Sequence, residues 1–295
     1  MRFTLRQLEV FLAVARDESV SRAAERLHLS QSAVSSSLAD LERQFDVRLF
    51  DRLGKRLQLS DRGRALRAPA RALLDQAAEL ERGFEDRSEL GSLRLGATLT
   101  IGDYLAVPLI ARFMAEHPGV EVSLAIANTE EIARRVANFE LDVGLLEGEL
   151  TASDLEVTAF RDDELVVFCA PDHPFARRRA LSDADLRAAS WVLREPGSGT
   201  RQAFDRAMAG LLPGLHIVLT LQQTEALKAA VMAGLGVGCI SRLALAGDFA
   251  RGTLVPCRVP QRDFRRQLSF ALHRHRHRRE VTERWLDLCR SSWAG

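Results

Sequence analysis

Residues 5–52 have the sequence LRQLEVFLAVARDESVSRAAERLHLSQSAVSSSLADLERQFDVRLFDR. Its apolar residues recur every three or four positions, which predicts three short amphipathic helices. The third begins at Ser30, a typical N-cap residue, after a short break at His28 and Leu29. Small polar residues occupy the outer face of this third helix. Two helices joined by a tight turn, the second with such a face, predict a helix-turn-helix whose second helix enters the major groove of DNA.

The third helix and the segment after it have side chains of the types that commonly contact DNA. Glutamine can bond adenine through two hydrogen bonds, and serine can bond bases or phosphates. In residues 47–66, cations flank Gly54 between short apolar runs, and this pattern predicts a two-stranded wing with phosphate contacts at its tip. We therefore predict DNA contacts at Ser21, Ser30, Gln31, Ser32, Ser35, Ser36, Arg52, Lys55 and Arg56.

Residues 60–88 predict one long helix. Its apolar positions keep a spacing of three or four residues and are Leu66, Ala70, Leu73, Leu74, Ala77, Leu80 and Phe84. Nothing nearby in the chain can bury such a stripe, so we expect it to pair with a second copy; packing within one chain is the alternative. Pro69 lies inside the helix, where it removes a hydrogen bond and is expected to kink it. We expect residues 89–92 to form the hinge to the next domain.

The charges of the chain are balanced in total but uneven in distribution. The 295 residues include 41 Lys+Arg and 40 Asp+Glu, a net charge of +1, and 46% of them are hydrophobic. This composition excludes a uniformly basic nucleic-acid coat and an acidic disordered chain. Residues 1–67, however, have 13 basic and 9 acidic residues, whereas residues 101–172 have 4 and 15. The basic block favours a polyanion as partner of the N-terminal part, and a solvated surface is the alternative.

Cysteine spacing and apolar segments indicate the compartment. The four cysteines lie far apart without a CxxC pair, which favours reduced thiols over a zinc site or a disulfide framework. The N-terminal residues lack the pattern of a signal peptide, and no apolar run reaches the roughly 18 residues of a membrane span. We therefore expect a cytoplasmic protein that does not enter the membrane.

From residue 91 onward, short apolar segments alternate with helical ones, which predicts an α/β architecture with mostly parallel sheets. One predicted strand covers residues 165–169. Ligands of such sheets bind at the carboxyl ends of strands and at helix starts, where backbone N–H groups are free. Hydroxyl and amide side chains occur at four such junctions: Thr98 and Thr100, Asn128 and Thr129, Ser198 and Thr200, and Thr224. They predict a shared anion site, although N-capping alone would also select these residue types.

Several short motifs are typical of one family. They are Ala23-Ala24 within the helix 21–27, the run 30–35, Leu41-Glu42, Leu49-Phe50-Asp51-Arg52, Ser60 with Arg62-Gly63, and the segments 139–144, 163–166, 170–174 and 234–238. With these motifs, the chain resembles LysR-type transcriptional regulators over nearly its whole length. One departure concerns the recognition helix. Family members often have a long polar residue after the serine at position 35, and this chain has Ser36 and Ser37.

The resemblance implies an α+β fold class with three parts. Residues 1–59 would form a winged helix-turn-helix, and residues 60–90 a linker and dimerisation helix. Residues 91–295 would form a two-lobed α/β effector-binding domain, built like a periplasmic binding protein. Its lobe I would hold residues 91–150 and 270–295, and its lobe II residues 151–269.

The resemblance also implies a ligand-responsive transcriptional regulator. Its oligomer, a dimer or a tetramer, would bind an interrupted palindromic operator in double-stranded DNA, and RNA polymerase is a partner if the protein activates transcription. A small effector in the cleft between the lobes would shift its conformation.

The junction motifs look closest to those of members tied to sulfur-oxyanion metabolism. By this resemblance, a sulfur oxyanion such as sulfite would be held by Thr98, Thr100, Thr129, Ser198 and Thr200. Glu147 at the cleft would bond a protonated species or a water, or favour an amine-bearing ligand.

An enzyme, or a simple small-molecule-binding protein that uses the two-lobed domain, is the alternative class of function. The sequence has no metal-ligand cluster and no nucleophile and base at motif spacing, so we predict no catalytic residue, metal or cofactor. The glycine-rich run 234–238 leads from helix to strand, which is the reverse of a dinucleotide-binding fingerprint.

Overall fold

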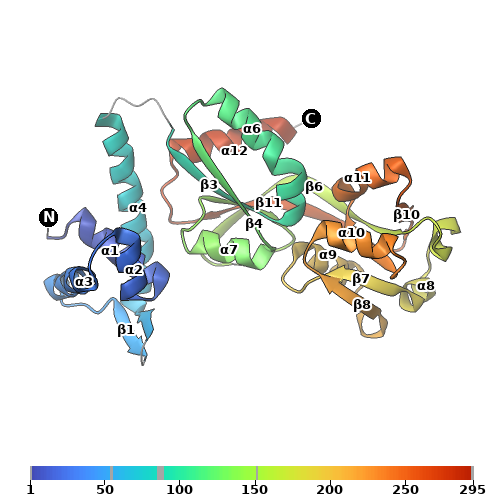
Figure 1. The fold of residues 1–295 in the computed structure, drawn as a ribbon, viewed down its shortest axis with the longest axis horizontal. Helices are drawn as coiled ribbons and strands as arrows, with labels where there is room; N and C mark the ends of the chain where they lie inside the picture. Colours follow the sequence, from blue (N-terminus) through green and yellow to red (C-terminus); the bar gives the residue numbers. More distant parts are fainter. Residues whose placement is uncertain (1, 54–55, 85–89, 151, 294–295) are drawn as a thin grey trace. The chain divides into compact units, whose positions relative to one another are not determined.

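A computed structural model gives the fold of the chain and describes residues 2–53, 56–84, 90–150 and 152–293 (Figure 1). The chain divides into two compact units. The first consists of residues 1–88 with 274–280, and the second of residues 89–273 with 281–295.

The first unit contains the predicted helix-turn-helix. Its elements are α1 (Leu5–Asp17), α2 (Val20–Leu27), α3 (Gln31–Phe45), β1 (Phe50–Leu53), β2 (Arg56–Leu59) and α4 (Asp61–Phe84). Thr4 caps α1 with a capping box, and the hydroxyls of Ser19 and Ser30 cap α2 and α3. The N-cap predicted at Ser30 is therefore confirmed. Ala33, which helical spacing places on the inner face of α3, is instead exposed, because Val34, Leu38 and Leu41 fill the space against α1 and α2.

The wing and the long helix follow directly from this core. Strands β1 and β2 pair antiparallel, with Phe50 opposite Leu59. Helix α4 continues through Pro69, and Gly63 in its first turn lies against the chain before β1. A Cβ on Gly63 would lie 2.2 Å from the carbonyl oxygen of Leu49, so glycine permits this close approach. The last residues of the predicted helix, 85–88, lie outside the described part of the chain.

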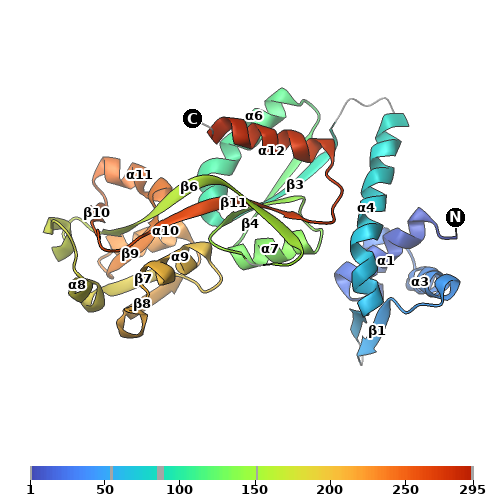
Figure 2. The same ribbon diagram turned by 180° about the vertical axis from the view of Figure 1, so that it is seen from behind.

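The second unit is built on one mixed sheet (Figures 1 and 2). Its strands are β3 (Ser92–Ala97), β4 (Glu121–Ile126), β5 (Val143–Glu147), β6 (Leu155–Cys169), β7 (Ser190–Arg194), β8 (His216–Leu221), β9 (Val237–Ser241), β10 (Val255–Cys257) and β11 (Arg265–His273). Its helical segments are α5 (Leu99–Ile101), η1 (Gly102–Ala106), α6 (Val107–Glu116), α7 (Thr129–Ala137), η2 (Pro174–Arg177), α8 (Asp183–Ala188), α9 (Gly199–Ala207), η3 (Leu212–Gly214), α10 (Thr224–Met232), α11 (Arg242–Arg251) and α12 (Glu280–Trp293). The strand order is β4-β3-β5-β11-β6-β9-β7-β8, and β10 also pairs with β6.

The prediction of mostly parallel sheets is wrong for the middle of this sheet. The outer pairs β3–β4, β3–β5, β7–β8 and β7–β9 are parallel, as predicted, but β6 and β11 pair antiparallel with each other and with their other neighbours. Strand β6 also begins at Leu155, ten residues before the strand predicted at 165–169. Most of these ten residues are partly or fully exposed, so no apolar run or strict alternation marks them in the sequence.

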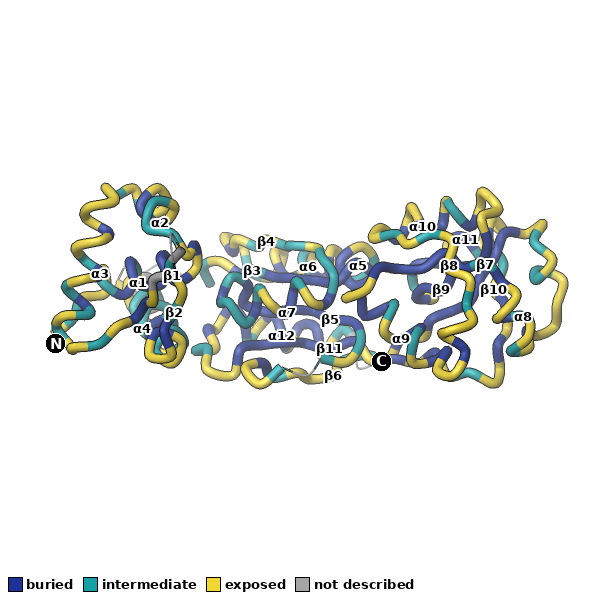
Figure 3. Tube along the Cα trace, turned by 90° about the horizontal axis from the view of Figure 1, so that it is seen from below, coloured by how far each residue is buried: buried dark blue, intermediate teal, exposed yellow. Residues whose placement is uncertain are grey.

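Strands β6 and β11 cross between two α/β lobes, each with its own core (Figure 2). In the first lobe, β3, β5 and β11 pack against α6 and α12, where the rings of Phe113 and Trp285 meet edge to face at 5.4 Å. In the second lobe, Trp191 of β7 and Phe204 of α9 meet at 4.9 Å. The inner strands are almost wholly buried (Figure 3), so each lobe has a closely packed interior.

Within the described ranges, no helix is long and apolar enough to cross a bilayer.

Trp285 provides a test of the first lobe's core. Its side chain is fully buried, and its indole N–H has no hydrogen-bond partner within the described residues. We expect Trp285→Ala to lower the free energy of unfolding by about 3–5 kcal/mol, because it leaves a large cavity. Trp285→Phe keeps a ring against Phe113 and removes the unpartnered N–H, so it should cost far less. Chemical denaturation measures both, and an equal loss for the two variants would contradict this account.

Candidate effector site and DNA interface

Helix α3 presents a polar face to solvent in the first unit. Gln31, its first residue, is exposed, as are Ser32, Ser35 and Ser36. Ser30 is also exposed, but its hydroxyl accepts a hydrogen bond from the N–H of Ala33 at 3.1 Å and lies 3.0 Å from the hydroxyl of Ser32. The structure thus gives Ser30 a capping role and leaves Gln31 at the start of the helix, where a recognition helix contacts base edges.

The remaining predicted DNA contacts lie on α2 and on the wing. Ser21 is half-buried in the first turn of α2. Arg52 lies on β1 and Arg56 on β2, at the end of the hairpin where these strands turn, and the structure describes their backbone. Lys55 lies outside the described residues. The backbone of the wing therefore places both arginines next to the turn, as the sequence predicts.

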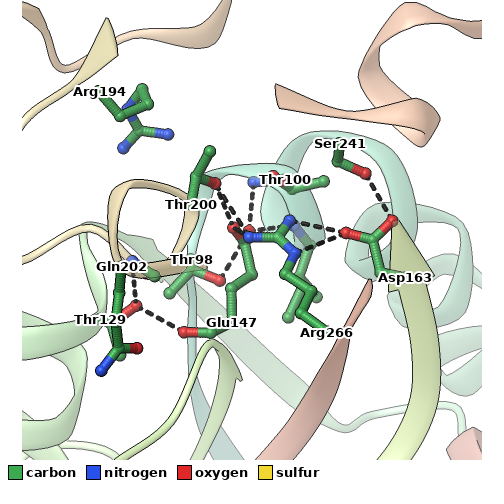
Figure 4. A network of polar contacts seen from close by, with 12 residues as sticks. Thr98, Thr100, Thr129, Glu147, Asp163, Arg194, Thr200, Gln202, Ser241 and Arg266 are labelled. Carbon is green, nitrogen blue, oxygen red and sulfur yellow. Dashed lines mark hydrogen bonds and ion pairs between the residues drawn. The ribbon is translucent and has the colours of Figure 1, made fainter. Parts of the chain in front are cut away.

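In the second unit, the predicted anion-binding residues gather around one carboxylate, that of Glu147 (Figure 4). Glu147 ends β5 and is 2% exposed. Its Oε1 accepts hydrogen bonds from the Thr98 hydroxyl at 2.9 Å, the Thr100 N–H at 2.8 Å and the Ile101 N–H at 3.3 Å. Its Oε2 accepts one from the Thr200 hydroxyl at 3.0 Å. Thr98 follows β3 and Thr200 follows β7, so the two lobes supply the donors from the carboxyl ends of their parallel strands.

Arg266, which is not among the predicted site residues, joins this carboxylate to the crossover strands. Its Nη1 lies 2.9 Å from Oε2 of Glu147, and its Nη2 lies 2.7 Å from Oδ2 of Asp163. Arg266 on β11 is directly opposite Asp163 on β6. Leu268, two residues further and therefore on the same face, is opposite Glu147 on β5. The sequence does contain a signal: Asp163 lies two residues before the strand predicted at 165–169, and Arg266 lies one residue before a second predicted strand, 267–272. Both charged residues fall just outside the predicted strands.

A second contact between the lobes passes through Thr129. Its hydroxyl donates to the carbonyl oxygen of Glu147 at 2.9 Å and accepts from the N–H of Gly199 at 3.1 Å. A Cβ on Gly199 would lie 1.9 Å from that same carbonyl oxygen, so glycine is required for this approach.

The other predicted effector residues take different positions. The Asn128 side chain accepts from the Glu131 N–H at 3.0 Å and so caps α7. Ser198 is the buried residue immediately before α9, and its side chain makes no capping hydrogen bond. Thr224 is buried at the start of α10, and among the described contacts none joins it to Glu147. The structure therefore brings Thr98, Thr100, Thr129 and Thr200 together with Glu147 and leaves these three outside the hydrogen-bonded cluster.

The electrostatics of the cluster favour an ionised carboxylate. Burial alone would raise the pKa of Glu147, but the Arg266 guanidinium and the hydrogen bonds from Thr98, Thr100 and Thr200 outweigh it and lower this pKa. The hydroxyl, N–H and guanidinium donors therefore form a site for a negatively charged oxygen, and the carboxylate of Glu147 occupies this site.

Further charged groups interact with Glu147 or lie near it. Burial, followed by the charges of Glu225 and Glu147, raises the pKa of Asp103. The Tyr104 hydroxyl donates to Glu225 at 2.7 Å across the lobes, and Arg194 is buried and paired with Glu195 at 2.8 Å. The surroundings of Glu147 thus contain charged groups of both signs.

The described residues contain no group of three or more His, Cys, Asp or Glu side chains that could hold a metal ion.

Comparison with known families gives the identity of both units. Residues 5–64 match the model of the bacterial regulatory helix-turn-helix protein of the lysR family, and residues 86–294 match the LysR substrate binding domain. The chain belongs to the LysR family. It is therefore a DNA-binding transcriptional regulator with an effector-binding domain, and not an enzyme.

Individual relatives of this LysR-family regulator are similar over most of its length. The uncharacterized HTH-type transcriptional regulator YeiE of Escherichia coli is 41% identical over 289 residues, which cover 98% of each chain. The HTH-type transcriptional regulator CysL of Bacillus subtilis is 32% identical over 267 residues, 89% of each chain. Among solved structures, a full-length OxyR variant of Pseudomonas aeruginosa has a TM-score of 0.74 at 22% identity and covers 98% of this chain and 94% of its own. This structural likeness supports the fold.

Gln31 is the residue with which we test base recognition by this LysR-family regulator. We expect Gln31→Ala to weaken binding to an operator selected from random DNA by about 1–3 kcal/mol, because a bidentate base contact is lost. Binding to random DNA should change little, since phosphate contacts dominate it. Fluorescence anisotropy with both DNAs measures the ratio, and an equal loss on both would contradict a base-reading role.

Gly199 tests the contact between the lobes. Gly199→Ala places a methyl group against the backbone of Glu147, so we expect a destabilisation of about 1–3 kcal/mol. Gly247→Ala in α11 is the matched control, because its Cβ would meet the mobile end of the Arg251 side chain at 3.1 Å. Thermal unfolding compares the two variants. A Gly199→Ala protein as stable as the control would show that the lobes do not approach as described.

Proposed function

We propose that this regulator binds an interrupted palindromic operator as an oligomer in the cytoplasm and responds to a sulfur oxyanion, with hydrogen sulfite as the preferred effector. RNA polymerase would be a further partner if the protein activates transcription. The observation that carries the effector assignment is the set of hydroxyl, backbone N–H and guanidinium donors around Glu147.

The donor set favours an oxyanion over an amine. Donors at a helix start and an arginine recognise negatively charged oxygens. An amine-bearing ligand would find the Glu147 carboxylate, but the positive charge of Arg266 lies 2.9 Å from that carboxylate and would repel it. The threonines at these junctions, by their resemblance to those of sulfur-oxyanion-responsive members, support the same conclusion.

Glu147 selects among oxyanions by charge and protonation. Its lowered pKa keeps it ionised near neutral pH, and it is buried, so a dianion beside it would be strongly disfavoured. An oxyanion that retains one proton can donate a hydrogen bond to the carboxylate and take over hydrogen bonds that Thr98, Thr100 and Thr200 otherwise donate to it. Hydrogen sulfite has this property near neutral pH, whereas sulfate does not.

Glu147 and Arg266 connect the proposed effector site to the crossover strands β6 and β11. A ligand that draws Glu147 toward itself weakens the pair with Arg266, and Arg266 also holds Asp163 on β6. The effector thereby acts on the two strands that join the lobes. A preference for one arrangement of these strands is what a population shift of the oligomer requires.

A thermal-shift panel of sulfite, sulfate, thiosulfate and amino acids tests the effector. We expect sulfite to stabilise the protein most, by about 2.7 kcal/mol at a hundred times its Kd. In Glu147→Gln the advantage of sulfite over sulfate should disappear, because the negative charge that disfavours a dianion is gone.

The matched control for this variant is Glu149→Gln. Glu149 is exposed and pairs with Arg206, so its variant should keep the wild-type order of ligands. Stabilisation by organic ligands alone would contradict the oxyanion proposal, and an unchanged order in Glu147→Gln would contradict the selective role of Glu147.

A further inference from the structure

The effector site around Glu147 is closed to solvent in this structure. Glu147 is 2% exposed, and the residues that bond its side chain are each at most 4% exposed: Thr98, Thr100, Ile101, Thr200 and Arg266. Thr200 belongs to the second lobe, so its hydroxyl bonds Glu147 only while the two lobes are together. A ligand therefore reaches this carboxylate only when the lobes separate.

The side chain of Tyr104 is one of the groups that hold the lobes together. Tyr104 belongs to η1 of the first lobe, but it packs against the apolar core of the second lobe, which contains Phe168 and Leu227. Its hydroxyl donates a hydrogen bond of 2.7 Å to Glu225 in the first turn of α10. The ring and the hydroxyl of this one side chain thus both contact the opposite lobe.

The helical segment that contains Tyr104 has an uncommon turn. Elements α5, η1 and α6 follow one another directly from Leu99 to Glu116, and η1 is a π-helix. Single π-helical turns within α-helices are rare and frequently lie at functional sites. The N–H groups of Thr100 and Ile101, which bond Glu147, lie just before this turn. Tyr104 is therefore part of the same short segment that supplies donors to the effector site.

Glu225 is held in position from within the second lobe. The Lys228 ammonium lies 2.7 Å from Oε1 of Glu225, and it also lies 2.9 Å from Oδ2 of Asp248 on α11. Burial opposes ionisation of Glu225, but the hydrogen bonds from Lys228 and Tyr104 outweigh it and lower this pKa. Burial, followed by the hydrogen bond to Glu225, raises the pKa of Tyr104 to about 12, so the phenol keeps the proton that it donates.

Two features make the contact between Tyr104 and Glu225 reversible. The Glu225 side chain is 70% exposed, so water can replace the phenol as its hydrogen-bond donor. The second feature is repulsion across the lobes: burial, followed by the charges of Glu225 and Glu147, raises the pKa of Asp103. The closed arrangement thus brings Asp103 of the first lobe near Glu225 of the second, and the phenol hydrogen bond offsets their repulsion.

We propose that Tyr104 acts as a latch, which keeps the lobes closed over Glu147 in the ligand-free protein and whose release lets a ligand enter. Separation of the lobes breaks the hydrogen bond to Glu225 and the apolar contact of the ring together, because both cross the same boundary. The role in ligand entry rests on the effector site proposed above, whereas the role in holding the lobes together does not.

Fluorine NMR of the ligand-free full chain tests the latch directly. Tyr104 is the only tyrosine, so protein made with 3-fluorotyrosine carries a single label. In Glu225→Ala we expect the resonance to shift toward that of the urea-unfolded protein and to broaden more with a soluble gadolinium chelate. Glu164→Ala is the matched control, because Glu164 is an exposed carboxylate of the second lobe that pairs with Arg242. An unchanged spectrum in Glu225→Ala, or an equal change in the control, would overturn the proposal.

Hydrogen exchange at residue resolution measures how often the ligand-free lobes separate. The Gly199 N–H donates to the Thr129 hydroxyl across the lobes, so it exchanges when they part. Tyr104→Phe keeps the ring and removes the donor, and it should speed this exchange about three- to tenfold, as expected for a partly exposed hydrogen bond to a charged group. Exchange within β7, inside the second lobe, should stay unchanged. An unchanged rate at Gly199, or an equal rise in β7, would contradict the latch.

Asp103→Asn provides a variant of opposite sign. It removes one of the two charges that repel each other across the lobes, so exchange at Gly199 should become slower. Faster exchange in this variant would contradict the proposal. All these measurements use the ligand-free protein, so they decide on the latch whether or not sulfite proves to be the effector.

Discussion

The buried pairing of Glu147, Arg266 and Asp163 is the interaction on which the effector domain depends. One guanidinium lies between two carboxylates, and all three side chains are at most 2% exposed. Removing a single charge from such a group costs about 3–5 kcal/mol, because the remaining charges stay buried without compensation. The three residues belong to β5, β11 and β6, which are adjacent in the sheet, and β6 and β11 carry the chain between the lobes.

This position connects the charged cluster to both lobes. Thr98 and Thr100 approach Glu147 from the first lobe, and Thr200 approaches it from the second. The Ser241 hydroxyl extends the network at Asp163, with a distance of 2.7 Å to Oδ1. A change in the charge or position of one carboxylate is therefore felt on both lobes, which is the property a ligand-responsive domain requires.

The sequence predicted those parts of the fold that local chemistry determines. The cap of α3 at Ser30, the polar outer face of this helix and the start of the linker helix follow from residue type and spacing within a few turns. The threonines at strand ends could also be predicted to meet, because parallel strands share a carboxyl edge. The side chain that occupies their site could not be predicted, because Arg266 and Glu147 are 119 residues apart and their contact depends on an antiparallel register. The first part of β6 was missed for a related reason: its residues are half exposed and lack a period.

The close approach of Gly199 to the backbone of Glu147 limits how the effector-binding domain can vary among related regulators. A Cβ at position 199 would lie 1.9 Å from the carbonyl oxygen of Glu147, so any other residue there would hold the two lobes further apart. Side chains elsewhere on the lobes can change without disturbing this spacing, whereas position 199 must keep its glycine.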